Sequence, residues 1–208
     1  MAAFFSNLRN TVIAGFVIAA IILGIHWSQT GVALDESFWL FAVRWAHIIC
    51  GVMWIGLLWY FNFVSTPTTP SIPADLRPAL GKYITPAALW WFRWGAMGTI
   101  VFGVILAGLN GYLAQAFSLD TYDANGMFGT PSYLMIGIGM WFGVIMWFNV
   151  WFIIWPNQQK ALNLGNRYPD LPADAKAAAA KTAGMYSRIN TMLSFPMLFC
   201  MAAASHLP

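Results

Sequence analysis

Long apolar stretches constrain the fold of this chain more than any other feature of its sequence. A helix that crosses the hydrocarbon core of a bilayer needs about 20 apolar residues, with a range of about 17–25. Five stretches have this length and character: residues 10–27, 38–64, 88–112, 133–155 and 189–205. They predict an all-α integral membrane protein in which residues 1–208 form a single membrane domain with five transmembrane helices.

The scarcity of charge excludes several soluble classes of protein. Hydrophobic residues make up 60% of the chain and charged residues 8%, whereas about a quarter of the residues in a soluble domain are charged. So few charges cannot cover a surface in contact with water, which excludes a soluble enzyme, a nucleic-acid binder and a disordered tail. The first apolar stretch follows Arg9 as a secretory signal would, but no small-x-small cleavage site closes it, so we interpret it as a retained anchor.

The positions of the basic residues predict the orientation. If the five stretches cross the membrane alternately, nine of the ten Lys and Arg residues fall on one side and only Arg44 falls on the other. Because basic residues concentrate on the cytoplasmic side, the N-terminus is predicted in the cytoplasm and the C-terminus outside it. The outer loops carry acidic residues instead: Asp35, Glu36, Asp120 and Asp123.

Two segments of the chain resemble each other. Tyr60-Phe61-Asn62 near the end of the second predicted span corresponds to Trp147-Phe148-Asn149 in the fourth, and each is followed by a proline, Pro67 or Pro156. The second and third spans could therefore form a parallel repeat with the fourth and fifth. Chance recurrence of short apolar motifs is the alternative explanation.

The three histidines lie in or beside three different predicted spans. Counted from the cytoplasmic edge of each span at 1.5 Å per residue, His26, His47 and His206 all lie at a depth of about 24–27 Å. We therefore expect them at one level near the outer membrane face. Imidazoles from separate helices at one height suit a haem iron or a metal ion. The simpler interpretation is that each bonds a carbonyl, a lipid headgroup or water.

The surroundings of His47 favour haem among these cofactors. Gly51 lies one turn further along the helix and Trp54 continues the same face, so a porphyrin would find room beside an aromatic ring. Arg44, three residues earlier, could pair with a haem propionate or extend to the lipid headgroups. We predict haem b with His47 as one axial ligand and His206 or His26 opposite. Copper or zinc bound by the three histidines is the alternative.

A second group of polar residues is predicted at the cytoplasmic ends of the spans. Asn62, Arg93, Asn149 and Asn190 could line a polar pocket that opens to the cytoplasm, where Arg93 would hold an anion or a planar polar substrate. The alternative is that these amides join helices by hydrogen bonds. No Walker A or zincin motif and no acidic residue within a predicted span occurs, which disfavours ATP-driven transport, hydrolysis and proton-coupled transport.

Two motifs resemble a known family. Arg44-Trp-Ala-His47-Ile-Ile-Cys-Gly51-Val-Met-Trp54 and Phe148-Asn149-Val-Trp-Phe-Ile-Ile-Trp155-Pro156-Asn-Gln158 resemble the membrane domain of the PuuD-type urate hydroxylases, over about residues 41–208. The resemblance implies an oxidoreductase of the bacterial inner membrane that hydroxylates urate and passes electrons to cytochrome c. The His-x-x-x-Gly-x-x-Trp pattern is also similar, more weakly, to the HemJ-type protoporphyrinogen oxidases and the CopD-like proteins.

The absence of a haem-attachment motif bears on the expected electron partner and on a non-enzymatic alternative. Urate hydroxylases often carry a C-terminal cytochrome c domain, but no C-x-x-C-H haem-attachment motif occurs here, so a separate cytochrome is the expected partner. The alternative is a non-catalytic accessory subunit of a larger respiratory or photosynthetic membrane complex, which the small extramembrane portion favours. In both cases the lipid bilayer is a partner and nucleic acid is not.

Overall fold

All regular secondary structure is helical in the part of the chain that the structure describes, which confirms the predicted all-α class. The computed structural model describes residues 2–31, 34–119 and 131–206, so Asp120 and Asp123 of the predicted outer loop lie outside it. The chain divides into two compact units, residues 1–42 and residues 43–208, which we describe separately.

The first unit is dominated by one apolar helix. It contains α1 (Ala2–Phe5), α2 (Leu8–Thr30) and the beginning of α3 (Glu36–Trp59). Asn7 caps α2, since its side chain accepts hydrogen bonds from two backbone N–H groups of the first turn, and Gly31 ends the helix in the left-handed conformation, with φ at 63°. No residue of α2 is buried. A helix that is apolar on all faces requires an apolar environment, which a bilayer provides.

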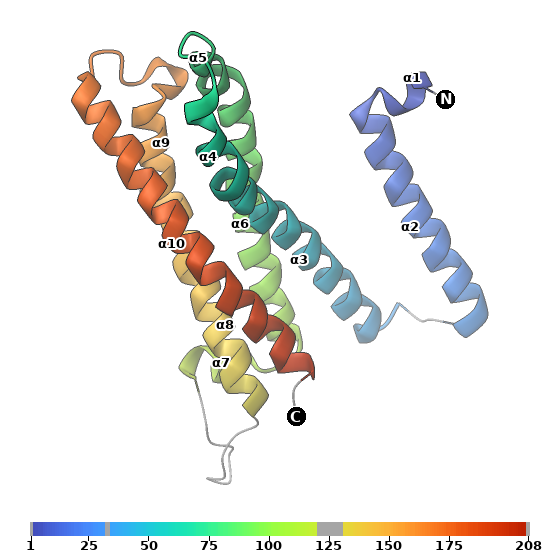
Figure 1. Ribbon diagram of the computed structural model, residues 1–208. Helices are drawn as coiled ribbons and strands as arrows, with labels where there is room; N and C mark the ends of the chain where they lie inside the picture. Colours follow the sequence, from blue (N-terminus) through green and yellow to red (C-terminus); the bar gives the residue numbers. More distant parts are fainter. Residues whose placement is uncertain (1, 32–33, 120–130, 207–208) are drawn as a thin grey trace. The chain divides into compact units, whose positions relative to one another are not determined.

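The second unit contains the remaining helices in a bundle. After α3 the order is η1 (Tyr60–Ser65), α4 (Thr66–Thr68), η2 (Thr69–Ser71), α5 (Arg77–Ala79), η3 (Leu80–Ile84), α6 (Thr85–Leu109), α7 (Leu113–Ser118), α8 (Pro131–Phe148), η4 (Asn149–Ile154), α9 (Trp155–Ala161), η5 (Leu164–Asn166) and α10 (Ala173–His206). Helix α10 packs along α8, η4 and α9, while α6 and α7 also contact α8. The connections that carry α4, α5 and α9 lie at one end of this bundle, and α7 lies at the other (Figure 1).

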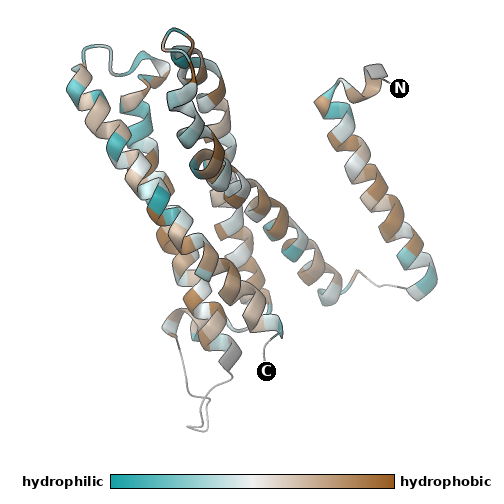
Figure 2. Cartoon of the chain, viewed as in Figure 1, coloured by the Kyte–Doolittle hydropathy of each residue, from teal (hydrophilic) through white to brown (hydrophobic). Residues whose placement is uncertain are grey.

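A small aromatic and aliphatic core joins these helices. Trp54, Leu58 and Met146 are fully inaccessible and belong to one cluster with Phe92 and Val150. Most other large apolar side chains face outward, and hydrophilic residues gather toward the end with α4, α5 and α9 (Figure 2). This distribution is the reverse of a soluble bundle and is typical of helices surrounded by lipid.

Four helical segments in the described ranges are long and apolar enough to cross a membrane, so the chain has the character of a multi-pass membrane protein. They are Leu8–Thr30, Glu36–Ser71, Arg77–Leu109 and Tyr133–Ala161, and they contain most of the first four predicted spans. The third predicted span, 88–112, ends earlier than expected because α6 stops at Leu109. Gly111 there adopts a positive φ of 75°, which terminates the helix.

The fifth predicted span, 189–205, is the apolar part of a much longer helix. Helix α10 has 34 residues, so it is about 51 Å long. Its first half carries Asp174, Lys176, Lys181 and Arg188. Helix α10 is not among the four segments that satisfy the length and hydropathy requirements.

Three π-helical segments share one cause. η1, η3 and η4 each end two residues before a proline, respectively Pro67, Pro86 and Pro156. A proline ring in a helix clashes with the carbonyl four residues earlier and lacks an N–H donor, and a wider turn moves that carbonyl away. Accordingly the residue before each proline donates to the carbonyl five residues earlier: Thr66 to Phe61, Thr85 to Leu80 and Trp155 to Val150. The two segments that resemble each other in sequence, at η1 and η4, thus share this structural feature.

Candidate functional site

Helix α6 fixes the orientation of the His47 imidazole. The Nδ1 atom of His47 lies 2.8 Å from the backbone carbonyl oxygen of Thr99. A carbonyl oxygen only accepts hydrogen bonds, so Nδ1 carries the proton and Nε2 keeps its lone pair. Gly103 permits this close approach, because a Cβ atom at that position would lie 3.0 Å from His47 Cε1. The imidazole therefore presents a single basic nitrogen in a defined direction.

His47 lines a partly open cavity in the second unit. Its volume is about 90 Å³. The walls are mainly apolar and come from α3, α6, α7, α8 and α10. Three thioethers contribute to them, from Met140, Met197 and Met201.

Trp54 lines the same cavity. Its side chain is fully buried, and its Nε1 atom has no hydrogen-bond partner among the described residues. A buried N–H group without a partner costs about 1–3 kcal/mol, so such groups are rare in folded proteins. His47 and Trp54 both line this largely apolar cavity.

The other two histidines are placed differently from His47. His206 is exposed near the end of α10, and its Nδ1 lies 2.9 Å from the carbonyl oxygen of Ala202 in its own helix. It does not line the His47 cavity. His26 is exposed on α2 of the first unit. Within the described ranges, no group of three or more His, Cys, Asp or Glu residues is arranged to hold a metal ion.

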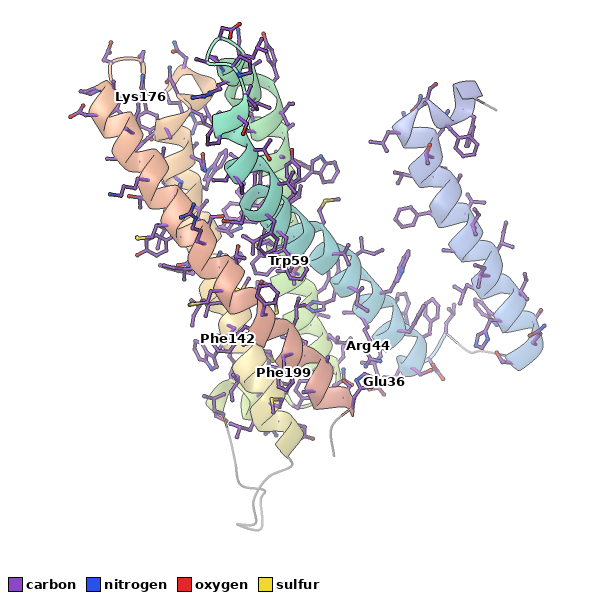
Figure 3. All side chains as sticks on the ribbon, viewed as in Figure 1. Glu36, Arg44, Trp59, Phe142, Lys176 and Phe199 are labelled. Atoms are coloured by element: carbon purple, nitrogen blue, oxygen red, sulfur yellow. The ribbon has the colours of Figure 1, made fainter. Side chains whose placement is uncertain are left out.

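The remaining predicted haem contacts are also outside the cavity. Arg44 is exposed on α3, at the opposite end of the second unit from Lys176 (Figure 3). A Cβ atom on Gly51 would be 4.0 Å from the Thr99 side chain, an ordinary contact, so Gly51 contributes no special opening. Glycines of α6 allow closer contact with α3 than Gly51 does. In addition to Gly103, a Cβ atom on Gly95 would lie 3.2 Å from the Trp54 backbone nitrogen.

Two of the predicted pocket residues form a buried hydrogen bond instead. Asn149 Nδ2 donates to Asn190 Oδ1 at 2.8 Å, and Asn190 Nδ2 donates to the carbonyl oxygen of Met146 at 2.9 Å. Both asparagines are buried. They join η4 and α8 to α10, which is the structural alternative considered for these amides.

The same face of α10 receives bonds from the second and fourth predicted spans. Asn62 Nδ2 donates to Ser187 Oγ at 2.8 Å, one turn before Asn190. Trp59 Nε1 donates to Ser194 Oγ at 2.9 Å, and Trp59 projects from α3 toward α10 (Figure 3). The two matching aromatic-Asn segments thus dock on one polar line along α10. Of the four predicted pocket residues, only Asn62 lines a second large cavity.

Arg93 is held by aromatic rings rather than by a polar pocket. Its guanidinium carbon lies 3.8 Å from the ring centre of Trp155 and 5.0 Å from that of Trp151. Its Nε atom is buried and has no hydrogen-bond partner among the described residues. The guanidinium therefore makes cation–π contacts where the sequence predicts that it holds an anion or a planar polar substrate.

Comparison with known proteins identifies no family for this chain. No family model, curated protein or solved structure matches the chain.

Proposed function

We propose that this protein is a membrane redox protein that binds haem b at His47 and exchanges electrons with a separate cytochrome. The observation that carries the proposal is the hydrogen bond from His47 Nδ1 to the Thr99 carbonyl. Ligating histidines characteristically donate their other ring N–H to a carbonyl or carboxylate, which fixes the tautomer and raises the basicity of the ligand nitrogen.

The residues around the cavity suit the group in donor chemistry. His47 and one of the thioethers of Met140, Met197 and Met201 would hold the iron, since haem iron accepts His with Met. The cavity volume of about 90 Å³ is smaller than the range of about 300–1,000 Å³ typical of ligand pockets, so binding of the group would require the helices around the partly open side to move apart. The group would supply reversible one-electron redox chemistry.

Copper is the second candidate for the same donors. Imidazole with soft thioether ligands suits copper, whereas zinc prefers thiolate, imidazole and carboxylate. Elemental analysis of the purified protein distinguishes iron from copper or zinc.

The proposed topology places the cavity near the outer surface. Five spans, with α10 as the fifth, put the N-terminus in the cytoplasm and the C-terminus in the periplasm of a bacterial inner membrane, as the basic residues favour. His47 then lies toward the periplasmic side, where a cytochrome could exchange electrons. The resemblance to urate hydroxylases makes urate the first substrate to assay in the presence of cytochrome c.

An absorption spectrum of the purified protein, oxidised and reduced, tests the cofactor. We expect a Soret band that is lost in His47→Ala and retained in His206→Ala. Gly103→Ala should also weaken haem retention, because the added methyl group would displace the imidazole. Gly108→Ala is the matched control on the same helix, since a Cβ atom there meets nothing within 4 Å. A protein without iron after gentle extraction, or a Soret band unchanged in His47→Ala, would refute the assignment.

The accessory-subunit alternative is favoured by the first unit. Helix α2 has no buried residue, so it could pack against the helices of a larger complex. Native gel electrophoresis of solubilised membranes separates the two functions. Migration only with a large complex, together with absence of haem from this chain, would support the accessory role.

A further inference from the structure

We propose that the second cavity of the bundle binds the headgroup of an anionic phospholipid. This cavity lies between the η1–η2 segment, α6, η4, α9 and α10, and its volume is about 1,150 Å³. It is separate from the His47 cavity, with which it shares no lining residue. The assignment does not depend on haem.

The charges along the cavity are of one sign. Lys181 and Arg188 both line it from α10, seven residues apart and therefore on one face of the helix. Neither forms an ion pair or hydrogen bond with another described residue, and no acidic side chain is present among the described lining residues. Two unpaired cations on one wall attract an anion.

The rest of the lining divides into an apolar and a polar part. Phe61, Leu89 and Phe92 form an apolar wall that adjoins the core. Hydroxyl groups from Ser65, Thr66 and Thr85 lie along the same cavity, and none of the three side chains has a hydrogen-bond partner among the described residues. A ligand that satisfies both parts has a charged, hydrogen-bond-accepting group attached to an apolar body.

A phospholipid fits this description better than a small soluble anion. Basic pockets between transmembrane helices at the cytoplasmic side are recurrent sites for anionic headgroups. The cavity reaches the end of the bundle that carries η2 and α9, since Thr69, Pro70 and Gln158 line it. The phosphate would lie between Lys181 and Arg188, and acyl chains would cover the apolar wall.

Lipid titration of the purified full-length protein, followed by native mass spectrometry, tests the proposal. We expect retention of phosphatidylglycerol and little retention of phosphatidylcholine. Lys181→Gln and Arg188→Gln should each weaken phosphatidylglycerol binding about fivefold, as expected for about 1 kcal/mol per basic residue. Arg188→Lys should retain most of the affinity, because a point charge suffices. Lys176→Gln is the matched control, since Lys176 is on the same helix but does not line the cavity.

The outcomes separate the possible sources of the anion. Binding of soluble glycerol phosphate as tight as that of phosphatidylglycerol would show that the acyl chains contribute nothing and would overturn the lipid assignment. Equal retention of the two lipids, or equal effects of Lys176→Gln and Lys181→Gln, would overturn it as well. His47→Ala should leave the lipid affinity unchanged, which keeps this result independent of the cofactor.

Discussion

At the scale of single residues, the contact between His47 and Thr99 determines which atom the protein can offer to a ligand. The sequence could identify His47 because an ionisable residue deep in an apolar stretch is conspicuous. It could not identify Thr99, because the acceptor is a backbone carbonyl and every residue has one. The sequence could not identify Gly103 either, because helix packing decides which glycine faces a neighbouring helix. Trp54 was recognised as a neighbour, but its unused N–H appears only in three dimensions.

The polar pocket shows the same limit. Asn62, Arg93, Asn149 and Asn190 were correctly identified as polar residues near one end of the spans. Their expected convergence assumed side chains that point to a common space. In the structure Asn149 bonds Asn190, and Arg93 stacks on Trp155. Each of these polar groups is thus paired with a side chain beside it in space. The spacing of residues along the sequence does not reveal such pairs.

The Asn149–Asn190 hydrogen bond should contribute measurably to stability. Asn149→Leu leaves Asn190 Oδ1 without its donor, so we expect the free energy of unfolding to fall by about 1–3 kcal/mol. The double substitution with Asn190→Leu should cost less than the sum of the single ones, with a coupling of about 0.6–1.7 kcal/mol.

Unfolding by sodium dodecyl sulfate in mixed micelles measures these differences. Asn157→Leu is the control, because among the described residues the Asn157 amide bonds only the carbonyl of Ile153, in its own helical segment. This substitution should change stability by about 0.5 kcal/mol or less. Strict additivity of the two asparagine substitutions would show that the bond is energetically irrelevant.

At the scale of the helices, the apolar stretches predicted the positions of the long helices better than the residues at which those helices begin and end. Hydropathy locates the middle of a span because burial in lipid depends on side-chain character. The ends depend on local chemistry: Gly111 stops α6, and the first half of α10 extends the last predicted span far beyond its apolar part. The π segments could be anticipated only partly. Pro67, Pro86 and Pro156 are visible in the sequence, but a proline can also kink or end a helix.

The beginning of α3 should depend on pH through Asp35. Its carboxylate accepts hydrogen bonds from Ser37 Oγ at 2.6 Å and from the Phe38 backbone N–H at 3.2 Å. These bonds, led by the one from Ser37, hold the pKa of Asp35 below its ordinary value of 3.8. The capping contribution is therefore complete above pH 3.8, and it is lost as the pH falls through the lowered pKa.

Nuclear magnetic resonance titration of the Phe38 amide between about pH 2 and 6 follows this change. We expect a transition below the ordinary carboxyl range in the native protein. Asp35→Asn should keep the cap, since asparagine is also a good N-cap, and should abolish the transition. Asp35→Ala should fray the first turn at every pH. A native transition above the ordinary value would contradict the capping role.

At the scale of the whole molecule, the segregation of basic residues makes a topological prediction. Lys160 in α9, Arg167 after η5 and Lys176 in the first turn of α10 follow one another along the chain. Lys176 lies at the opposite end of the second unit from Arg44 (Figure 3). With five spans, alkaline phosphatase fused after residue 208 should be active, because it would be exported to the periplasm. A fusion after residue 166 should be inactive, and green fluorescent protein at that site should fluoresce. The opposite pattern at residue 208 would show that α10 does not cross the membrane.

In the proposed topology, the length of α10 determines what the protein presents to the cytoplasm. A rod of about 51 Å is longer than a hydrocarbon core of about 30 Å by roughly 20 Å. With the apolar half of α10 in the bilayer, its alanine-rich half would extend into the aqueous layer, where it packs against α9 on one side. A soluble protein that approaches this side of the bilayer would contact the projecting half of α10 before it reached the lipid.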